Sequence, residues 1–232
     1  MTIHEKIQAY YSGMSNEHHR YRSWEHCYRY FHSASRESIE ADRDQAALRL
    51  GFYLASWGMY RGSSFLLQYA YTIHRGVIDR LLVPTLAVLW DRDFGAGEGD
   101  EELIPVILEA VRAIREAYKP FVTETQPGQP THTLVTKILL GTLGCMPACD
   151  RFFVDGLKRS GLAYSRGNGK FIEGLLRFTK EHVRELHEEQ DRIEFAGGLR
   201  YPLMKLVDMY FWQIGFERSF SNLELAQVFG SE

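Results

Sequence analysis

The chain has 232 residues, of which 45% are hydrophobic and 25% are charged, and its formal net charge is -3. This composition is ordinary for a folded protein with a buried core, and it excludes wholesale disorder and a histone-like coat for nucleic acid. At roughly 150 residues per domain, the length allows one domain or two small ones. No apolar run approaches the ~20 residues of a membrane span, and Met1 to Lys6 lacks the features of a signal peptide. We therefore expect a cytoplasmic protein without a membrane partner.

The three cysteines are Cys27, Cys145 and Cys149. An odd number of cysteines without a secretion signal predicts free thiols rather than a disulfide scaffold. Cys145 and Cys149 are four residues apart, but Pro147 between them argues against a shared helical face, and no second pair with metal-binding spacing completes a site. We expect buried, inert thiols, no metal and no cofactor.

Apolar residues recur every three or four positions along most of the chain, which is typical of amphipathic helices. The expected helices span residues 38–60, 77–89 with a kink or break at Pro84, 100–118 with Asp100 as N-cap, 131–143, 150–161, 171–193, and 203–216 with Pro202 in the first turn. The glycines within 93–99 and the turn at 165–169 predict loops. No segment alternates with the period of a strand, and no repeat is visible. The sequence predicts an all-α protein, either one body or two lobes at about 35–120 and about 121–215, the latter with the N-terminal segment 1–34.

One segment, from Gln126 to Phe153, contains the most informative motif: QPGQPTHTLVTKILLGTLGCMPACDRFF. It predicts a tight turn at Pro127 and Gly128, a helix, a second turn, and Asp150 at the start of the next helix. A turn before a helix exposes backbone N–H groups that have no partner within the helix. These groups and the positive end of the helix bind phosphate without a lysine.

This segment resembles the helix-hairpin-helix DNA glycosylase superfamily. The signature of that family is a hairpin of the form L-P-G-x-G-x-x-T-A, followed about two dozen residues later by the catalytic aspartate. Pro127 and Gly128 match the first Pro-Gly of the hairpin, and Thr133 matches its threonine. Asp150 follows Gly128 by 22 residues and matches the aspartate. The resemblance implies that Asp150 is catalytic, and that Gly128, His132 and Thr133 hold the DNA backbone.

The segment departs from the family pattern at two positions. Pro130 replaces the second glycine, which changes the expected geometry of the hairpin. His132 stands where family members that also cleave the strand through a Schiff base carry a lysine. The resemblance therefore implies a glycosylase without a lyase step, or one whose lysine comes from elsewhere, with Lys137 as the nearby candidate. The run TKILL is also similar to the archaeal 8-oxoguanine glycosylase branch, and the four-cysteine iron–sulfur loop of some members is absent after Cys149.

The run LASWGMYRGSS forms a second patch, in which Trp57 precedes Asp150 by 93 residues. In the family that the chain resembles, an early helix ends at about this distance in a turn. That turn fills the gap left by the extruded base and forms part of the pocket wall. The resemblance implies these roles for Trp57, Met59, Tyr60 and Arg61, although aromatic residues at helical spacing are more often core residues.

Two further features have both a structural and a functional interpretation. Seven aromatic residues between Tyr10 and Phe31 interleave with arginines, a pattern that suits stacking on nucleic acid and makes Trp24 a candidate for the pocket. A helix that packs these aromatic residues on the body of the protein is the commoner explanation. Lys205 and Asp208 are three positions apart and suggest a local ion pair. If their helix lines the cleft, Asp208 is a second candidate carboxylate.

The sequence favours a two-lobed, monomeric glycosylase that removes a damaged or modified base from DNA, in repair or in defence against phage. A base inside a duplex is out of reach, so the nucleotide must rotate out, and a fixed carboxylate then stabilises the positive charge that develops on the sugar. Asp150 also has the sequence context of an ordinary N-cap, and Pro127 and Gly128 that of an ordinary turn. The alternative is a non-catalytic helical module that binds nucleic acid or protein.

Overall fold

A computed structural model describes residues 2–14, 16, 18–90, 92–122, 129–166, 168–193 and 198–229, with backbone alone for 220–229. The α-helices are α1 (Ile3–Ser12), α2 (Arg22–Ser33), α3 (Arg36–Ala41), α4 (Arg43–Ser56), α5 (Arg75–Leu81), α6 (Ile104–Tyr118), α7 (His132–Thr142), α8 (Arg151–Arg159), α9 (Gly169–Glu181), α10 (Val183–Arg192) and α11 (Leu203–Phe229). Short 3-10 helices are η1 (Phe65–Gln68), η2 (Tyr71–His74), η3 (Pro84–Leu89), η4 (Asp100–Leu103) and η5 (Lys119–Phe121). The described residues contain no strand, which confirms the predicted all-α class. None of their helices is long and apolar enough to cross a membrane.

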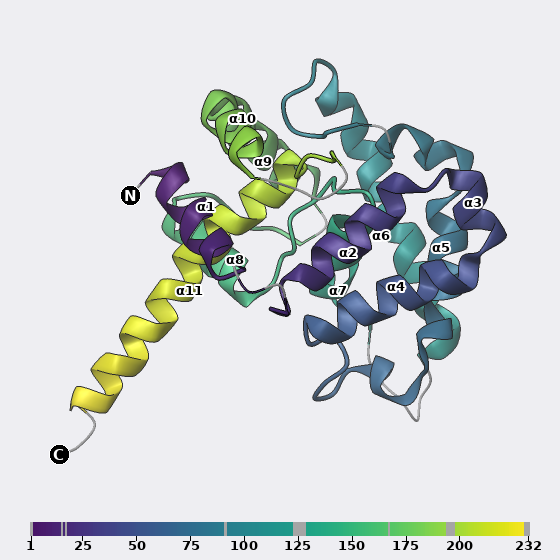
Figure 1. Ribbon diagram of the computed structural model, residues 1–232, viewed down its shortest axis with the longest axis horizontal. Coiled ribbons are helices and arrows are strands. Elements are labelled where there is room, and N and C mark those ends of the chain that lie inside the picture. The colour runs from purple at the N-terminus through teal and green to yellow at the C-terminus, as the bar shows by residue number, and fades with distance from the viewer. Residues whose placement is uncertain are drawn as a thin grey trace.

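The helices pack in two groups (Figure 1). In one group α2 packs on α4 and α7, α4 also packs on α5 and α7, and α5 packs on α6. In the other group α8 and α1 both pack along α11, and α10 contacts α1 and α11. Helix α9 contacts α6 of the first group and α10 of the second, and the segment that leads from α7 to α8 crosses from one group to the other. The crossing segment carries Asp150.

Two helices that were predicted as continuous are each divided into two. The helix predicted at 38–60 breaks at Asp42, which has non-helical backbone angles (φ -124°, ψ 62°) and whose carboxylate accepts a hydrogen bond from the N–H of Gln45 to cap α4. The helix predicted at 171–193 breaks at His182 (φ -115°, ψ 17°), between α9 and α10. Neither residue has the strong breaking tendency of proline or glycine, and the periodicity of the apolar residues continues across both breaks. The helix expected at 77–89 breaks at Pro84 as predicted: α5 ends at Leu81 and η3 begins at Pro84.

The prediction that Asp100 caps a helix is wrong. Its carboxylate is fully buried and accepts hydrogen bonds from the backbone N–H groups of Gly95 (2.7 Å) and Gly97 (2.9 Å). The same carboxylate pairs with the guanidinium of Arg92 at 2.5 Å. Asp100 therefore closes the glycine-rich loop at 93–99, and α6 begins only at Ile104. A loop that supplies two free N–H groups competes for the carboxylate more strongly than the first turn of a helix.

Helices α8 and α11 cross at two glycines. A Cβ atom at Gly156 would lie 1.8 Å from the carbonyl oxygen of Phe211, and one at Gly215 would lie 2.0 Å from that of Phe152. The two backbones therefore approach more closely than any side chain permits. This crossing fixes α8, and with it the N-terminal end of α8, against the longest helix of the protein. Helix α11 continues past its predicted end at 216 and projects from the body as the yellow helix of Figure 1.

Candidate functional site

A cleft of about 1220 Å³ opens at the N-terminal ends of α7 and α8. Its wall also includes Met59 from the turn after α4, Arg115 from α6, and Tyr164 to Arg166 from the loop before α9. Its charged lining residues are four cations, Arg115, Arg151, Lys158 and Arg166, and two carboxylates, Asp150 and Asp155. A protein of net charge -3 thus has a locally basic hollow. Such a hollow suits an anionic ligand.

Asp150 is the N-cap of α8 and also faces the cleft. Its Oδ1 atom accepts a hydrogen bond from the N–H of Phe153 at 3.1 Å, which satisfies one of the free donors of the first turn. Its Oδ2 atom lies 3.7 Å from Nζ of Lys137. The side chain is 18% exposed and lines the cleft. The predicted position at the start of a helix is confirmed, and the second carboxylate oxygen, which takes no part in the cap, faces Lys137.

Lys137 lies beneath Asp150 on α7. Its side chain is only 3% exposed, and its ammonium nitrogen sits 4.7 Å from the centre of the Trp57 ring. Burial lowers the pKa of Lys137, while the nearby carboxylates of Asp150 and Asp208 raise it. The buried ammonium therefore depends on those two carboxylates for its charge.

Asp208 is not in the cleft but supports it from behind. Its Oδ2 atom pairs with Nζ of Lys205 at 2.8 Å, and both side chains are at most 4% exposed. Its Oδ1 atom accepts a hydrogen bond from the backbone N–H of Ala148 at 3.0 Å. Burial raises the pKa of Asp208, and the adjacent Lys205 lowers it. Asp208 thus holds in place the irregular segment that immediately precedes Asp150.

Two threonines of α7 hold the same segment from the other side. The hydroxyl of Thr133 donates to the carbonyl of Cys149 at 2.8 Å, and the hydroxyl of Thr136 accepts from the N–H of Cys149 at 2.9 Å. Thr133, predicted to contact DNA, lines the cleft while making this internal bond. Together with Asp208, these contacts fix the backbone on both sides of Cys149. All three cysteines are free and buried, as the sequence predicts.

The N-terminal end of α7 forms another part of the cleft. The hydroxyl of Thr131 caps the helix by accepting from the N–H of Leu134 at 3.1 Å. His132 is 8% exposed and lines the cleft, and neither of its ring nitrogens has a hydrogen-bond partner among the described residues. Burial, with the positive charges of Arg115 and Arg166, lowers the pKa of His132 to about 4, so its ring is neutral at pH 7. Pro127 and Gly128, the predicted hairpin residues, lie outside the described residues.

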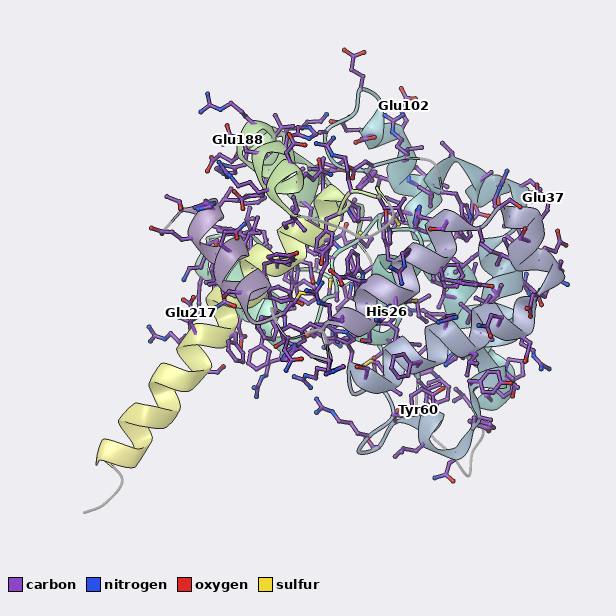
Figure 2. All side chains as sticks on the ribbon, viewed as in Figure 1. His26, Glu37, Tyr60, Glu102, Glu188 and Glu217 are labelled. Carbon is purple, nitrogen blue, oxygen red and sulfur yellow. The ribbon has the colours of Figure 1, made fainter. Side chains whose placement is uncertain are left out.

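The patch at 57–61 divides between the cleft and the interior. Met59 lines the main cleft, and Met59 and Arg61 together line an adjoining hollow of about 400 Å³. Tyr60, labelled in Figure 2 at the edge of the molecule below α4, instead bonds through its hydroxyl to Nε2 of His74 at 2.7 Å. The other ring nitrogen of His74 bonds to the hydroxyl of Tyr118 at 2.6 Å. Tyr60 therefore anchors the turn that presents Met59.

Trp57 and Trp24 are both held by other aromatic residues. The ring of Trp57 stacks on Tyr21 with centroids 4.8 Å apart. Trp24 is buried, donates its indole N–H to the carbonyl of Leu140 at 3.1 Å, and stacks on Tyr28. Trp24 thus belongs to the core, at the contact between α2 and α7.

Several lining residues of the cleft carry no sequence signal of their own. Arg115 lies on α6, Lys158 on α8, and Arg166 in the loop before α9, and none of them belongs to a recognisable motif. Only the packing of the helices brings these cations around Asp150. Comparison with family models, with curated proteins and with solved structures finds no match in any of the three.

Proposed function

We propose that the protein is a DNA glycosylase that hydrolyses the N-glycosidic bond of a damaged or modified base rotated out of double-stranded DNA. The observation that carries the proposal is the carboxylate of Asp150 in a cleft that is also lined by four cationic side chains, Arg115, Arg151, Lys158 and Arg166. The cations suit the phosphates of DNA, and Oδ2 of Asp150, which takes no part in the helix cap, suits a positive charge that develops between them.

In the proposed reaction the bond between the sugar C1′ and the base nitrogen breaks, and the electron pair leaves with the base. Positive charge then develops on the sugar ring, and Oδ2 of Asp150 stabilises it because Oδ1 is already occupied by the N–H of Phe153. A water molecule adds to C1′ and loses a proton, and the base gains one. The products are a free base and an abasic site.

The N-terminal end of α7 would hold the DNA backbone. Backbone N–H groups at the start of a helix bind phosphate, and the unpartnered ring nitrogens of buried His132 supply a second polar contact at the same place. Arg115 and Arg166 lie close enough to lower the pKa of His132, so their positive charge acts at the same end of the helix. Arg151 and Lys158 extend the cationic lining along α8.

The proposed reaction ends at the abasic site. A Schiff base needs an amine, and a neutral imidazole at position 132 does not provide one. The amine of Lys137 is buried beneath Asp150 and close to the ring of Trp57. We therefore expect that borohydride, which traps a Schiff base between enzyme and DNA, leaves no covalent complex with wild-type protein.

The test is formation of abasic sites by wild-type protein and by Asp150→Asn. Asparagine caps a helix as well as aspartate does, so this variant keeps the cap of α8 and removes the carboxylate charge. Duplexes that carry oxidised or alkylated bases, and phage DNA with hypermodified bases, are incubated with each protein and then treated with hot alkali. We expect strand breaks with wild type and with the control Asp155→Asn, which removes the other carboxylate of the cleft, but not with Asp150→Asn. The DNA that breaks would distinguish repair from defence against phage.

The capping bond of Asp150 favours a second candidate, a non-catalytic helical module that binds nucleic acid. In that case Asp150 only closes α8, and the cationic cleft only holds the backbone. Equal binding of DNA by wild type and Asp150→Asn, with no strand breaks on any DNA, would support this candidate and contradict the glycosylase.

A further inference from the structure

Lys137 and Asp150 form an ion pair whose two members differ in exposure. The Lys137 side chain is 3% exposed, whereas that of Asp150 is 18% exposed and lines the cleft. Nζ of Lys137 lies 3.7 Å from Oδ2 of Asp150, which is longer than a hydrogen bond, so the two groups attract each other mainly through their charges. Oδ1 of the same carboxylate accepts the N–H of Phe153. The ammonium therefore faces the oxygen of Asp150 that the helix cap does not use.

The packing of α7 does not explain a lysine at position 137. The other buried side chains of the helix are uncharged, since His132 is neutral at pH 7. Moving an ammonium out of water is costly, and an apolar side chain of similar length in its place is often neutral or stabilising. The contacts around the ammonium are the carboxylate at 3.7 Å and the face of Trp57, whose ring centre is 4.7 Å away. Buried charges of this kind, next to a cleft, are typical of functional sites.

Among the described residues, Lys137 is the one cation paired with Asp150. The ionisable groups that face this carboxylate from neighbouring elements are Tyr21 at the start of α2, Tyr53 on α4, Lys137 on α7, Cys149 in the preceding segment and Asp208 on α11. Burial raises the pKa of Tyr21, Tyr53 and Cys149, so these groups are neutral at pH 7. The charge of Asp208 is balanced by Lys205 at 2.8 Å. The charge that acts on Asp150 from the interior is therefore that of Lys137.

We propose that Lys137 is a positioning residue for Asp150: its charge keeps the carboxylate ionised, in the orientation in which Oδ1 caps α8 and Oδ2 does not. This inference rests on the proposed function, because only an ionised Asp150 stabilises positive charge on the sugar. Lys137 itself lies beneath the carboxylate and acts through it. The fold does not depend on Lys137, since its partner is hydrated at the cleft and keeps the bond from Phe153 when the lysine is removed.

The first test follows the carboxyl carbon resonance of Asp150 during a pH titration. The resonance is identified by its loss in Asp150→Asn. An opposite charge this close favours the ionised carboxyl, so we expect the midpoint in Lys137→Met to lie at least about one pH unit above that of wild type. The control is Lys180→Met, which removes an exposed lysine of α9 that pairs with Glu101, and it should titrate as wild type does. Equal midpoints in wild type and Lys137→Met would overturn the proposal.

The second measurement distinguishes positioning from a structural role. Because Lys137→Met leaves no charge buried without a partner, we expect it to melt at or above the temperature of wild type. The matched control is Lys205→Met, the same change at the other lysine of the cluster. It deprives Asp208, which is 4% exposed, of its partner and should lower the melting temperature by at least about 6 °C. A loss in Lys137→Met as large as that in Lys205→Met would make Lys137 a structural residue and overturn the proposal.

The pH dependence of cleavage is the third readout. With Lys137→Met, the rate of strand breakage should begin to fall at a pH about one unit higher than with wild type, while KM is unchanged. An identical pH profile in the two proteins would overturn the proposal. The first two measurements involve no DNA. If they give the expected results and no DNA is cleaved, the glycosylase is rejected and the action of Lys137 on Asp150 stands. If wild type cleaves and the midpoint of Asp150 does not move, the role of Lys137 alone is rejected.

Discussion

Two buried histidines, His74 and His132, are kept neutral by their surroundings. Burial lowers the pKa of His74 to about 3, and burial with nearby arginines lowers the pKa of His132 to about 4. Both values lie below the ~6.5 of an unfolded histidine. Between the folded and unfolded values the unfolded chain binds protons that the folded protein does not, so the free energy of unfolding falls as the pH falls.

We therefore expect stability to be constant near pH 7 and to decrease from about pH 6 towards pH 4, by at most about 1.4 kcal/mol per pH unit for each histidine. Urea unfolding at pH 7, 6 and 5 measures this slope. His74→Gln should reduce this slope to the part that His132 contributes, since glutamine does not titrate and can still bond to Tyr60 and Tyr118. The exposed His26, changed to Gln, is the control and should leave the slope unchanged. A slope that is equally steep in His74→Gln would contradict the assignment.

The sequence reveals single residues where a local rule governs them. Thr131 and Asp150 were predicted near helix starts, and the side chains of both cap their helices. Asp208 was predicted to pair with Lys205 because the two are one helical turn apart. Its bond to Ala148 joins residues 60 positions apart in the chain, and no local pattern contains that information. The same holds for Tyr60, whose bond to His74 depends on how η2 packs against α4.

Among the elements, α8 and α11 depend on their paired glycines. Gly156→Ala places a methyl group against the carbonyl of Phe211, and the helices must move apart, so we expect a loss of about 3 kcal/mol in the free energy of unfolding. Gly174→Ala in α9 is the matched control, because nothing lies within 4 Å of its added Cβ. That change should instead stabilise the protein by about 0.5–1 kcal/mol. Equal effects of the two substitutions in urea unfolding would show that the close crossing is not a constraint.

The ion pair of Lys205 and Asp208 within α11, whose carboxylate also bonds to the segment before α8, gives a further prediction. Asp208→Ala leaves the ammonium of Lys205 buried without its carboxylate and the N–H of Ala148 without an acceptor, so we expect a loss of about 3–5 kcal/mol. The double variant Lys205→Met with Asp208→Asn removes both charges and keeps an acceptor for Ala148. It should recover most of that loss. A double variant as unstable as Asp208→Ala would mean that the charges themselves stabilise the fold.

The helix pattern was predictable because apolar periodicity and capping residues are local, and the breaks at Asp42 and His182 were not. Each break lets two shorter helices take different directions over the core, and the advantage comes from packing rather than from the residue at the break. The cleft was less predictable still. Its carboxylate was found from one motif, whereas its cations come from α6, α8 and a loop that are distant in sequence.

For the whole molecule, the basic cleft predicts a strong dependence of DNA binding on salt. If Arg115, Arg151, Lys158 and Arg166 each neutralise a phosphate, the logarithm of the binding constant should fall with the logarithm of salt concentration with a slope of roughly -3.6. Arg151→Glu should reduce this slope by about 1 or more and weaken binding on all sequences. Arg184→Glu, with the same change in net charge at an exposed position of α10, should leave the slope unchanged. Equal loss of binding in the two variants, measured by fluorescence anisotropy, would place the DNA elsewhere.

Asp150 both caps α8 and lines the cleft, and this combination affects how the position can evolve. In many enzymes the catalytic residue destabilises the folded state, so substitutions there increase stability while they abolish activity. Here the carboxylate also closes α8, and most substitutions would remove a capping bond worth about 1 kcal/mol along with the proposed chemistry. Selection for a stable protein and selection for an active one would then favour the same residue. A population that no longer needed the activity would drift at this position chiefly toward the few residues that still cap a helix: asparagine, serine and threonine.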